Sequence, residues 1–282
     1  MLQQKKIAFI GAGNMAEAIF SGLIHQEKVA AEQIHVTNRS NYDRLNHLRE
    51  KYGVQVSTSK EEVLQNADIV ILAMKPIGVK DAVNDIRPLT SKNQLFLSVL
   101  AGITTEYISN LLGHSAPVVR VMPNTSAAVG SSATMIAAGD NANEEDMEMT
   151  SSLFEAVGMV KQVPEHDVDS LTAIAGSGPA FMYYLVEGMY ESLEELNLDK
   201  DLGKEVIIQM MQGAIDLMKS TDQSPRELYL NVKSPGGTTE AGLNVLEDND
   251  YQDIMIECIK GAAKRSRDIT KELSTLPEKT LS

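Results

Sequence analysis

Residues 6–16 join a short apolar run to the pattern G-x-G-x-x-A, reading Lys6-Ile7-Ala8-Phe9-Ile10-Gly11-Ala12-Gly13-Asn14-Met15-Ala16. An apolar helical spacing follows this stretch. The first glycine permits a tight strand-to-helix turn, the second lets the backbone touch a pyrophosphate, and the small Ala16 lets helix and strand pack closely. The amino end of the helix adds partial positive charge. The stretch therefore predicts a dinucleotide site that includes Ile10, Gly11, Ala12, Gly13, Asn14 and Met15.

The next expected strand, at residues 34–37, ends at Asn38-Arg39-Ser40. A chain that prefers NAD usually has Asp or Glu here, which holds the ribose 2′-hydroxyl. An amide, a guanidinium and a hydroxyl instead suit a 2′-phosphate, because Arg binds phosphate through charge-assisted hydrogen bonds. We therefore expect Asn38, Arg39 and Ser40 to bind NADPH, with NADH as a possible second cofactor. The alternative for Arg39 is a solvated loop cation.

Apolar runs and helix-length segments alternate through the first half of the chain. This alternation is typical of a parallel sheet with right-handed crossovers. After residue 163 only helical spacing remains. The sequence thus predicts an α/β chain, with a Rossmann-type, doubly wound and mostly parallel sheet domain at residues 1–163 and an all-helical domain at residues 164–282. The expected strands lie at residues 6–10, 34–37, 54–56, 69–72, 95–98, 118–121, 131–137 and 159–162.

The helices expected after residue 163 carry wide apolar stripes, and a small helical domain has few neighbours to cover them. A second copy of the chain is one way to bury such stripes. We therefore expect residues 164–282 to form the contact of a homodimer. A crowded internal core is the alternative.

Charge and composition limit the classes of partner that the protein is expected to bind. A net charge of −14 and a pI near 4.8 argue against nucleic acid or an anionic membrane as partners. The single Cys258 cannot form an internal disulfide, and its helical setting suggests a packed thiol. With no basic-then-apolar segment at the start, we expect a cytoplasmic protein. The five histidines are widely scattered, so no metal site is expected.

Residues 231–239 form a second motif, Asn231-Val232-Lys233-Ser234-Pro235-Gly236-Gly237-Thr238-Thr239. Proline fixes a bend, and paired glycines reach conformations closed to other residues and let a ligand approach the main chain. Successive N–H groups then converge on a carboxylate or phosphate. The alternative is an ordinary turn between helices, in which Thr239 or Glu240 caps the second helix.

Several further motifs lie between and beside these two stretches. They are Leu72-Ala73-Met74-Lys75-Pro76, Ser98 with Ala101-Gly102, Val119-Arg120-Val121-Met122-Pro123-Asn124-Thr125, Ala175-Gly176-Ser177-Gly178-Pro179-Ala180, and Ala241-Gly242-Leu243 after residues 234–239. Together with the turn at residues 11–16, they make the chain resemble the pyrroline-5-carboxylate reductases over essentially its whole length. Met74, where valine is common, and Ser126, where proline is common, are mild departures.

This resemblance implies reduction of the C=N bond of 1-pyrroline-5-carboxylate to L-proline with NAD(P)H, the last step of proline biosynthesis. Hydride would pass from the nicotinamide to the imine carbon. A homodimer would be the basic unit, with a decamer as a possible larger assembly. The resemblance also assigns roles to residues: Thr239 as the catalytic hydroxyl at the ring nitrogen; Ser234, Gly236, Gly237 and Thr238 at the substrate carboxylate; Glu165 as a further substrate contact; Ala101 and Asn231 at the nicotinamide half; and Ala73, Met74, Lys75 and Pro76 at the ribose side.

Two other functions stay open from sequence. A different imine or β-hydroxyacid reductase shares the plan of a Rossmann domain plus helices, but does not need the anion-binding loop in this form. A non-enzymatic NADP-binding paralogue is the second, because a fold does not secure a function. The presence of Thr239 in an intact loop argues against the second.

Overall fold

A computed structural model describes residues 2–274 of the 282-residue chain. The chain forms two compact units. The described residues of the sheet unit are 2–177 and 262–274, and the helical unit is Gly178–Gly261. The helical unit is therefore inserted into the sheet unit rather than appended to it.

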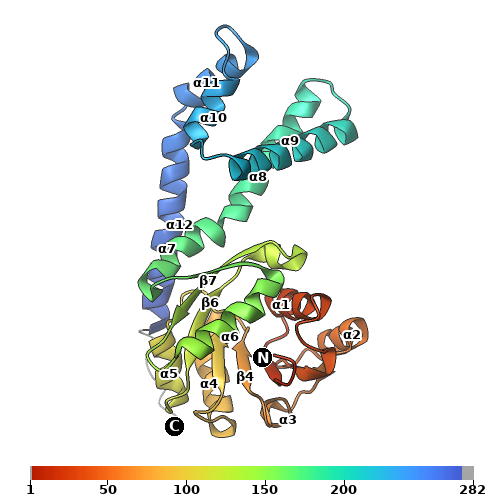
Figure 1. Cartoon of the computed structure of the whole chain (residues 1–282), viewed down its shortest axis with the longest axis vertical. Helices are drawn as coiled ribbons and strands as arrows, with labels where there is room; N and C mark the ends of the chain where they lie inside the picture. Colours follow the sequence, from red (N-terminus) through yellow and green to blue (C-terminus); the bar gives the residue numbers. More distant parts are fainter. Residues whose placement is uncertain (1, 275–282) are drawn as a thin grey trace. The chain divides into compact units, whose positions relative to one another are not determined.

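One eight-stranded sheet forms the centre of the sheet unit, with strand order β3-β2-β1-β4-β5-β6-β7-β8. Strands β4, β6 and β7 of this sheet are labelled in Figure 1. All neighbouring strands are parallel except β6 and β7, which are antiparallel. The sheet confirms the doubly wound, mostly parallel arrangement predicted from sequence. The strands are β1 (Ile7–Ile10), β2 (Ile34–Thr37), β3 (Gln55–Val56), β4 (Ile69–Leu72), β5 (Leu95–Ser98), β6 (Val118–Met122), β7 (Ser132–Ala138) and β8 (Gly158–Gln162).

The central strands β1, β4 and β5 are apolar except for Ser98, because helices cover both faces of the sheet. One face packs on α1, α2 and α6, and the other on α3, α4 and α5. These helices are α1 (Asn14–His25), α2 (Tyr42–Tyr52), α3 (Lys60–Leu64), α4 (Val79–Ile86), α5 (Thr105–Leu112) and α6 (Glu144–Phe154). Short 3₁₀ turns are η1 (Ala31–Gln33), η2 (Pro76–Gly78), η3 (Arg87–Leu89), η4 (Thr125–Val129) and η5 (Glu155–Val157).

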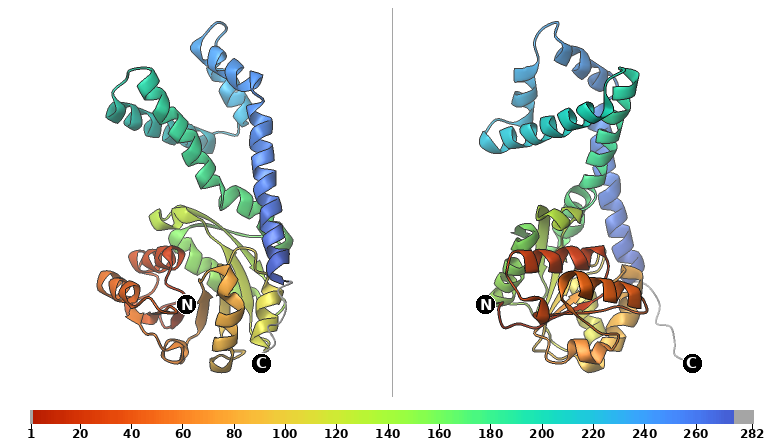
Figure 2. Two further views of the ribbon diagram at one scale, coloured as in Figure 1. Left: turned by 180° about the vertical axis from the view of Figure 1, so that it is seen from behind. Right: turned by 90° about the vertical axis from the view of Figure 1, so that its right-hand side faces the viewer.

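Helix α7 (Glu165–Ala175) begins where the strand pattern ends, yet it packs with the sheet unit. Its Val168 is buried in a cluster with Met122 of β6 and Met135 of β7. The last part of α12 (Tyr251–Ser274) also belongs to the sheet unit, although the helix is unbroken (Figure 2). The compact units thus differ from the expected division at residue 163, which stays a prediction about functional domains.

The helical unit contains α8 (Gly178–Glu195), α9 (Lys200–Ser220), α10 (Pro225–Val232), α11 (Thr238–Asp248) and the start of α12. Among its described residues, Leu193 alone has a buried side chain. That side chain sits against Gly203, where an added Cβ would lie 2.5 Å from a Leu193 methyl carbon. The unit therefore has almost no core of its own within one chain.

Cys258 is exposed on α12, so the expectation of a packed thiol is wrong for the single chain. Cys258 is exposed because no other part of the described chain covers the apolar faces of these helices. No described helix combines the length and the apolar character that crossing a bilayer requires.

Candidate active site

Gly11 sits in the turn that leads from β1 into α1 and has a φ of +120°. A Cβ built on it would lie 2.4 Å from the carbonyl oxygen of Ala73, just after β4. No side chain fits there, and L residues rarely adopt this conformation. The first glycine of the motif is therefore required by the close approach of two strand ends.

Gly13 is the second glycine of the motif, where the sequence predicts a backbone that a ligand can approach. It caps α1 without any side-chain hydrogen bond, and a Cβ added to it would meet nothing within 4 Å. The first N–H groups of a helix have no intrahelical acceptor. Here they are left available to an anion beside an exposed glycine, which fits a pyrophosphate.

Arg44 of α2 supports this turn and was missed by the sequence reasoning. Its Nε donates to the carbonyl oxygen of Ala12 at 2.9 Å, and its Nη2 pairs with Glu17 of α1. Glu17 also accepts hydrogen bonds from Tyr52 at 2.7 Å and Lys51 at 3.0 Å. Burial opposes ionisation of Glu17, but the hydrogen bonds from Tyr52, Arg44 and Lys51 outweigh it and lower its pKa to about 2. This cluster fixes the glycine turn to two helices.

At the end of β2, the three residues expected to bind the 2′-phosphate divide into two roles. The Asn38 side chain closes the turn, accepting from Asn41 N–H at 2.9 Å and donating to the Asn41 carbonyl at 2.8 Å. Arg39 and Ser40 are exposed. In the described part of the chain, the Arg39 guanidinium has no hydrogen-bond or ion-pair partner. Asn38 thus shapes the loop, while Arg39 and Ser40 stay free to bind a ligand.

The remaining cofactor residues of the sheet unit follow β4 and β5. Ala73 N–H donates to the Ile10 carbonyl at 2.9 Å, which joins the ends of β4 and β1. Pro76 starts η2, and Lys75 and Ala101 are exposed. Because β2, β1, β4 and β5 are adjacent and parallel, their carboxyl ends share one edge of the sheet. The structure thus gathers the expected cofactor residues there, apart from Asn231, which lies in the helical unit.

Glu165 begins α7, and its carboxylate is already engaged. It accepts from Thr105 N–H at 2.8 Å and from the Thr105 hydroxyl at 2.7 Å, and lies 3.8 Å from Arg120. These bonds tie α7 to the start of α5. A direct substrate contact through Glu165 stays a prediction.

Glu165 also lines a polar cavity of about 720 Å³ beside α5. Glu106 and Asp140 line the same cavity, together with His114. Burial, followed by the nearby Arg87 charge, lowers the pKa of His114. With three carboxylates and a histidine that favours its neutral form, this cavity does not suit an anionic substrate.

The loop at residues 234–239, hereafter the 234–239 loop, leads from α10 into α11. Gly236 has a φ of +72°, and its N–H donates to Glu240 Oε2 at 2.7 Å. Gly237 caps α11 without a side-chain bond, and its N–H donates to the Ser234 carbonyl at 2.9 Å. Lys233 lies 3.6 Å from the other oxygen of Glu240. One carboxylate of the chain thus occupies a donor and a cation that a substrate carboxylate would use.

The alternative reading of this loop, a turn in which Thr239 or Glu240 caps α11, agrees with the structure only in part. Glu240 reaches back from the first turn of α11 to Gly236, as that alternative expects. Thr239 does not act as the cap, because the capping position is Gly237. Within the described residues the Thr239 hydroxyl has no hydrogen-bond partner, so it is available to a ligand.

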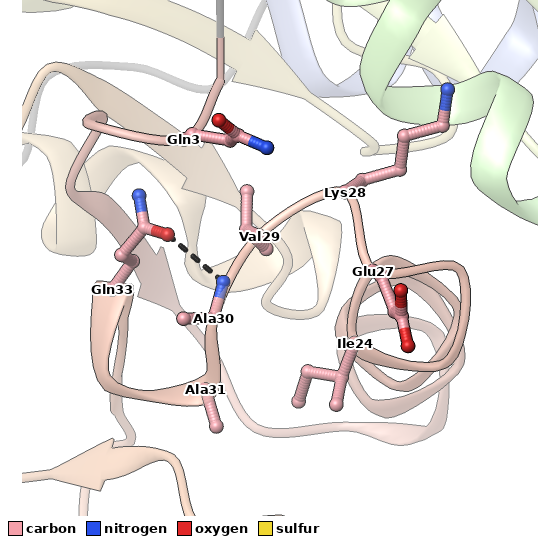
Figure 3. A pocket seen from close by; sticks show the side chains of 8 residues that line it. All are labelled: Gln3, Ile24, Glu27, Lys28, Val29, Ala30, Ala31 and Gln33. Carbon is pink, nitrogen blue, oxygen red and sulfur yellow. Dashed lines mark hydrogen bonds between the residues drawn. The ribbon is translucent and has the colours of Figure 1, made fainter.

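A further pocket, of about 380 Å³, lies at the opposite edge of the sheet, before β2 (Figure 3). Gln33 closes it by accepting from Ala30 N–H at 2.9 Å and donating to the Leu2 and Lys5 carbonyls. These bonds join the residues before β1 to the residues before β2. The pocket lies at the amino ends of these strands, whereas the expected cofactor residues lie at the carboxyl ends.

Comparison with known proteins identifies both halves of the chain. A family model described as "Pyrroline-5-carboxylate reductase dimerisation" matches residues 165–269. A model described as "NADP oxidoreductase coenzyme F420-dependent" matches residues 6–102. Pyrroline-5-carboxylate reductase 2 of Bacillus subtilis (strain 168) is 42% identical over 270 residues, which cover 96% of this chain and 97% of the relative.

Solved structures agree. A pyrroline-5-carboxylate reductase from Coxiella burnetii aligns with a TM-score of 0.85 at 34% identity, covering 95% of this chain and 99% of the other. The Plasmodium falciparum pyrroline carboxylate reductase, crystallised with NADP bound, aligns with a TM-score of 0.88 at 27% identity, covering 96% and 100%. With relatives this similar along almost its full length, the chain belongs to the pyrroline-5-carboxylate reductase family.

Proposed function

We propose that the chain reduces the C=N bond of 1-pyrroline-5-carboxylate to L-proline with NADPH, the last step of proline biosynthesis, and that NADH is a second, weaker cofactor. Residues 1–163 form the nucleotide-binding domain in this proposal, and residues 164–282 the substrate and dimerisation domain. The observation that supports it is the presence, in a member of this family, of both an open glycine turn and a glycine-containing 234–239 loop in which the Thr239 hydroxyl has no partner among the described residues.

The chain's own residues account for cofactor binding. The N–H groups at the start of α1 hold the pyrophosphate, beside Gly13. Arg39 and Ser40 hold the 2′-phosphate, which is why NADPH is preferred. Ala73, Met74, Lys75 and Pro76 line the ribose side, and Ala101 and Asn231 the nicotinamide half. The bound nicotinamide supplies the hydride.

The substrate carboxylate binds the 234–239 loop by exchange with Glu240. The incoming carboxylate takes the Gly236 N–H, and the first-turn N–H groups of α11, including Thr238, complete the cradle. Ser234 holds the loop in shape through its bond to Gly237. Because the protein carries a net charge of −14, the substrate must be gathered by such local groups rather than by the overall field.

Thr239 acts on the ring nitrogen. Hydride addition at the imine carbon is helped by protonation at nitrogen, and such imines are readily protonated, so no strong acid is needed. A hydroxyl both donates and accepts hydrogen bonds, so it can follow the nitrogen as it changes from planar iminium to tetrahedral amine. Its contribution is therefore expected to grow toward the transition state.

The direct test is the oxidation of NADPH by the full-length protein, followed by the absorbance of the reduced nicotinamide. We expect turnover with 1-pyrroline-5-carboxylate, and none in the reverse assay with 3-hydroxy acids and NADP. Turnover of the hydroxy acids alone would favour the related class of reductases. NADPH binding without turnover of either substrate would identify a non-enzymatic paralogue.

The same proposal includes self-association. The match to a dimerisation model and the nearly coreless helical unit support a homo-oligomer. We infer a dimer through the helical unit as the basic assembly, with a decamer as a larger form. The single cysteine, which cannot form an internal disulfide, fits the reducing environment of the cytoplasm, where we place the protein.

A further inference from the structure

Arg120 on β6 is the largest fully buried side chain among the described residues, with 1% of its side chain exposed. Its Nη2 donates to Oδ1 of Asp169 on α7 at 2.6 Å, and Asp169 is 13% exposed. A buried charge left without its partner is strongly unfavourable. This pair therefore fixes α7 to the sheet.

The same carboxylate also binds α12. Ser266 donates to Asp169 Oδ1 at 3.0 Å, and Thr270 donates to Oδ2 at 3.3 Å. Arg267 adds a bond to Ser170 at 3.3 Å. Asp169 thus joins β6, α7 and α12, three elements that are far apart in sequence.

This part of α12 packs on the loop that follows β5. Gly102 has a φ of +73°, and a Cβ added to it would lie 2.6 Å from a methyl carbon of Ile269. Ala101, expected to contact the nicotinamide half, is the preceding residue. At the end of the loop, Glu165 of α7 binds Thr105, the first residue of α5. The loop at residues 99–104 therefore packs on α12 at Gly102 and is followed at Thr105 by the contact to α7.

We propose that Asp169 is a positioning residue that presses the end of α12 against the loop at residues 99–104 and so sets Ala101 for the nicotinamide. The inference rests on the proposed function for its catalytic consequence. Both chain connections between the units pass through this cluster, because α7 leads into the helical unit and α12 returns from it. Asp169 acts through these elements and touches neither substrate nor cofactor.

Two variants of the full-length protein separate this role from general stability. Asp169→Asn keeps the size and removes the charge, while Ser266→Ala with Thr270→Val removes the α12 bonds and leaves the Arg120 pair. Asp167→Asn, at an exposed position of the same helix, is the matched control. Amide hydrogen exchange without cofactor reports on residues 99–105 and 262–270, with residues 7–25 as the internal reference.

We expect faster exchange at residues 99–105 and 262–270 in both variants, and unchanged exchange at residues 7–25. We expect kcat to fall about tenfold or more, in line with a displaced binding surface, while the Kd for NADPH changes less than about threefold. Asp169→Glu restores part of kcat, and Asp167→Asn resembles the wild type.

Unchanged exchange at residues 99–105 in folded variants overturns the inference. So does faster exchange everywhere with equal losses in NADPH binding and kcat, which indicates a role in stability alone. If Asp169→Asn does not fold, the Ser266 and Thr270 double variant decides. A wild type that binds NADPH but does not reduce the imine refutes the proposed function, while the exchange comparison still judges the contact.

Discussion

At Arg39 the guanidinium is exposed beside a turn that Asn38 has already closed. We predict that Arg39→Ala weakens NADPH binding by about ten- to a hundredfold, because it loses a charge-assisted hydrogen bond of roughly 1.5–3 kcal/mol. NADH binding is barely affected, since NADH lacks the 2′-phosphate. Fluorescence titration with both cofactors measures this. Arg49→Ala, an exposed cation of α2, is the control, and equal losses for NADPH and NADH contradict the assignment.

Thr239 carries the chemical prediction. Thr239→Val keeps the shape and removes the hydroxyl, so kcat for the imine falls by about ten- to a thousandfold, as for loss of one positioned donor. The Kd for NADPH stays near the wild-type value. Thr239→Ser keeps a hydroxyl at this position, so it retains most of the wild-type kcat. A folded Thr239→Val enzyme with wild-type kcat would mean that solvent or the substrate's own proton completes the reaction.

For Glu240 we predict that a substitution improves substrate binding, because its carboxylate competes with the substrate for Gly236 N–H and Lys233. Removing it in Glu240→Ala lowers KM for the imine by roughly two- to tenfold, the scale of one hydrogen bond, and leaves kcat unchanged. Steady-state kinetics measures both constants. An increase in KM instead shows that Glu240 mainly holds the loop in shape.

At the scale of elements, α1 and α2 are joined through Glu17, whose pKa is lowered to about 2 from its usual 4.5. A lowered folded-state pKa gives stability that is complete above the usual value and is lost as pH falls toward the folded-state value. We predict that wild type is more stable than Glu17→Gln at pH 7, and that the difference shrinks below about pH 4.5. Urea midpoints at several pH values test this, with the exposed Glu61→Gln as control. A difference that is independent of pH contradicts the prediction.

The central strands were predictable because β1, β4 and β5 are short apolar runs that end next to glycine, alanine or polar residues. The glycine turn was predictable because Gly11 and Gly13 serve requirements that are local in sequence. Arg44 was not, since it reaches Ala12 across 32 positions without any local signal.

The grouping of elements into units was also beyond the sequence pattern. Helix α7 and the end of α12 belong with the sheet because Asp169 pairs with Arg120, 49 positions away, and with Ser266, 97 positions away. Helical periodicity predicts that these segments are helices. It contains no information on which side-chain pair, formed across the chain, fixes them to the sheet.

At the scale of the molecule, the exposed apolar side chains of the helical unit predict that the protein associates with itself. Its α9 exposes Leu202, Val206 and Met210, and large apolar patches on soluble proteins mark interaction surfaces. Light scattering should give a multiple of the 30.7 kDa protomer mass across a wide concentration range.

Variants locate the contact. Leu202→Glu with Val206→Glu shifts the mass toward one protomer, because each charge is placed on the apolar contact. Binding of NADPH, which uses the sheet unit, is retained. Met159→Glu, on an exposed position of β8, leaves the mass unchanged. A monomeric wild type at every concentration contradicts a dimer through the helical unit.

The insertion of the helical unit into the sheet unit fixes an order of events on the ribosome. When β8 has emerged, the nascent sheet unit still lacks the last part of α12, which is translated only after the whole helical unit. At 5–20 residues per second this delay is on the order of ten seconds. During this delay Asp169 lacks its partners Ser266 and Thr270, while helices α8 and α9 emerge with exposed apolar side chains. Two growing chains can therefore meet through their helical units before either sheet unit is complete.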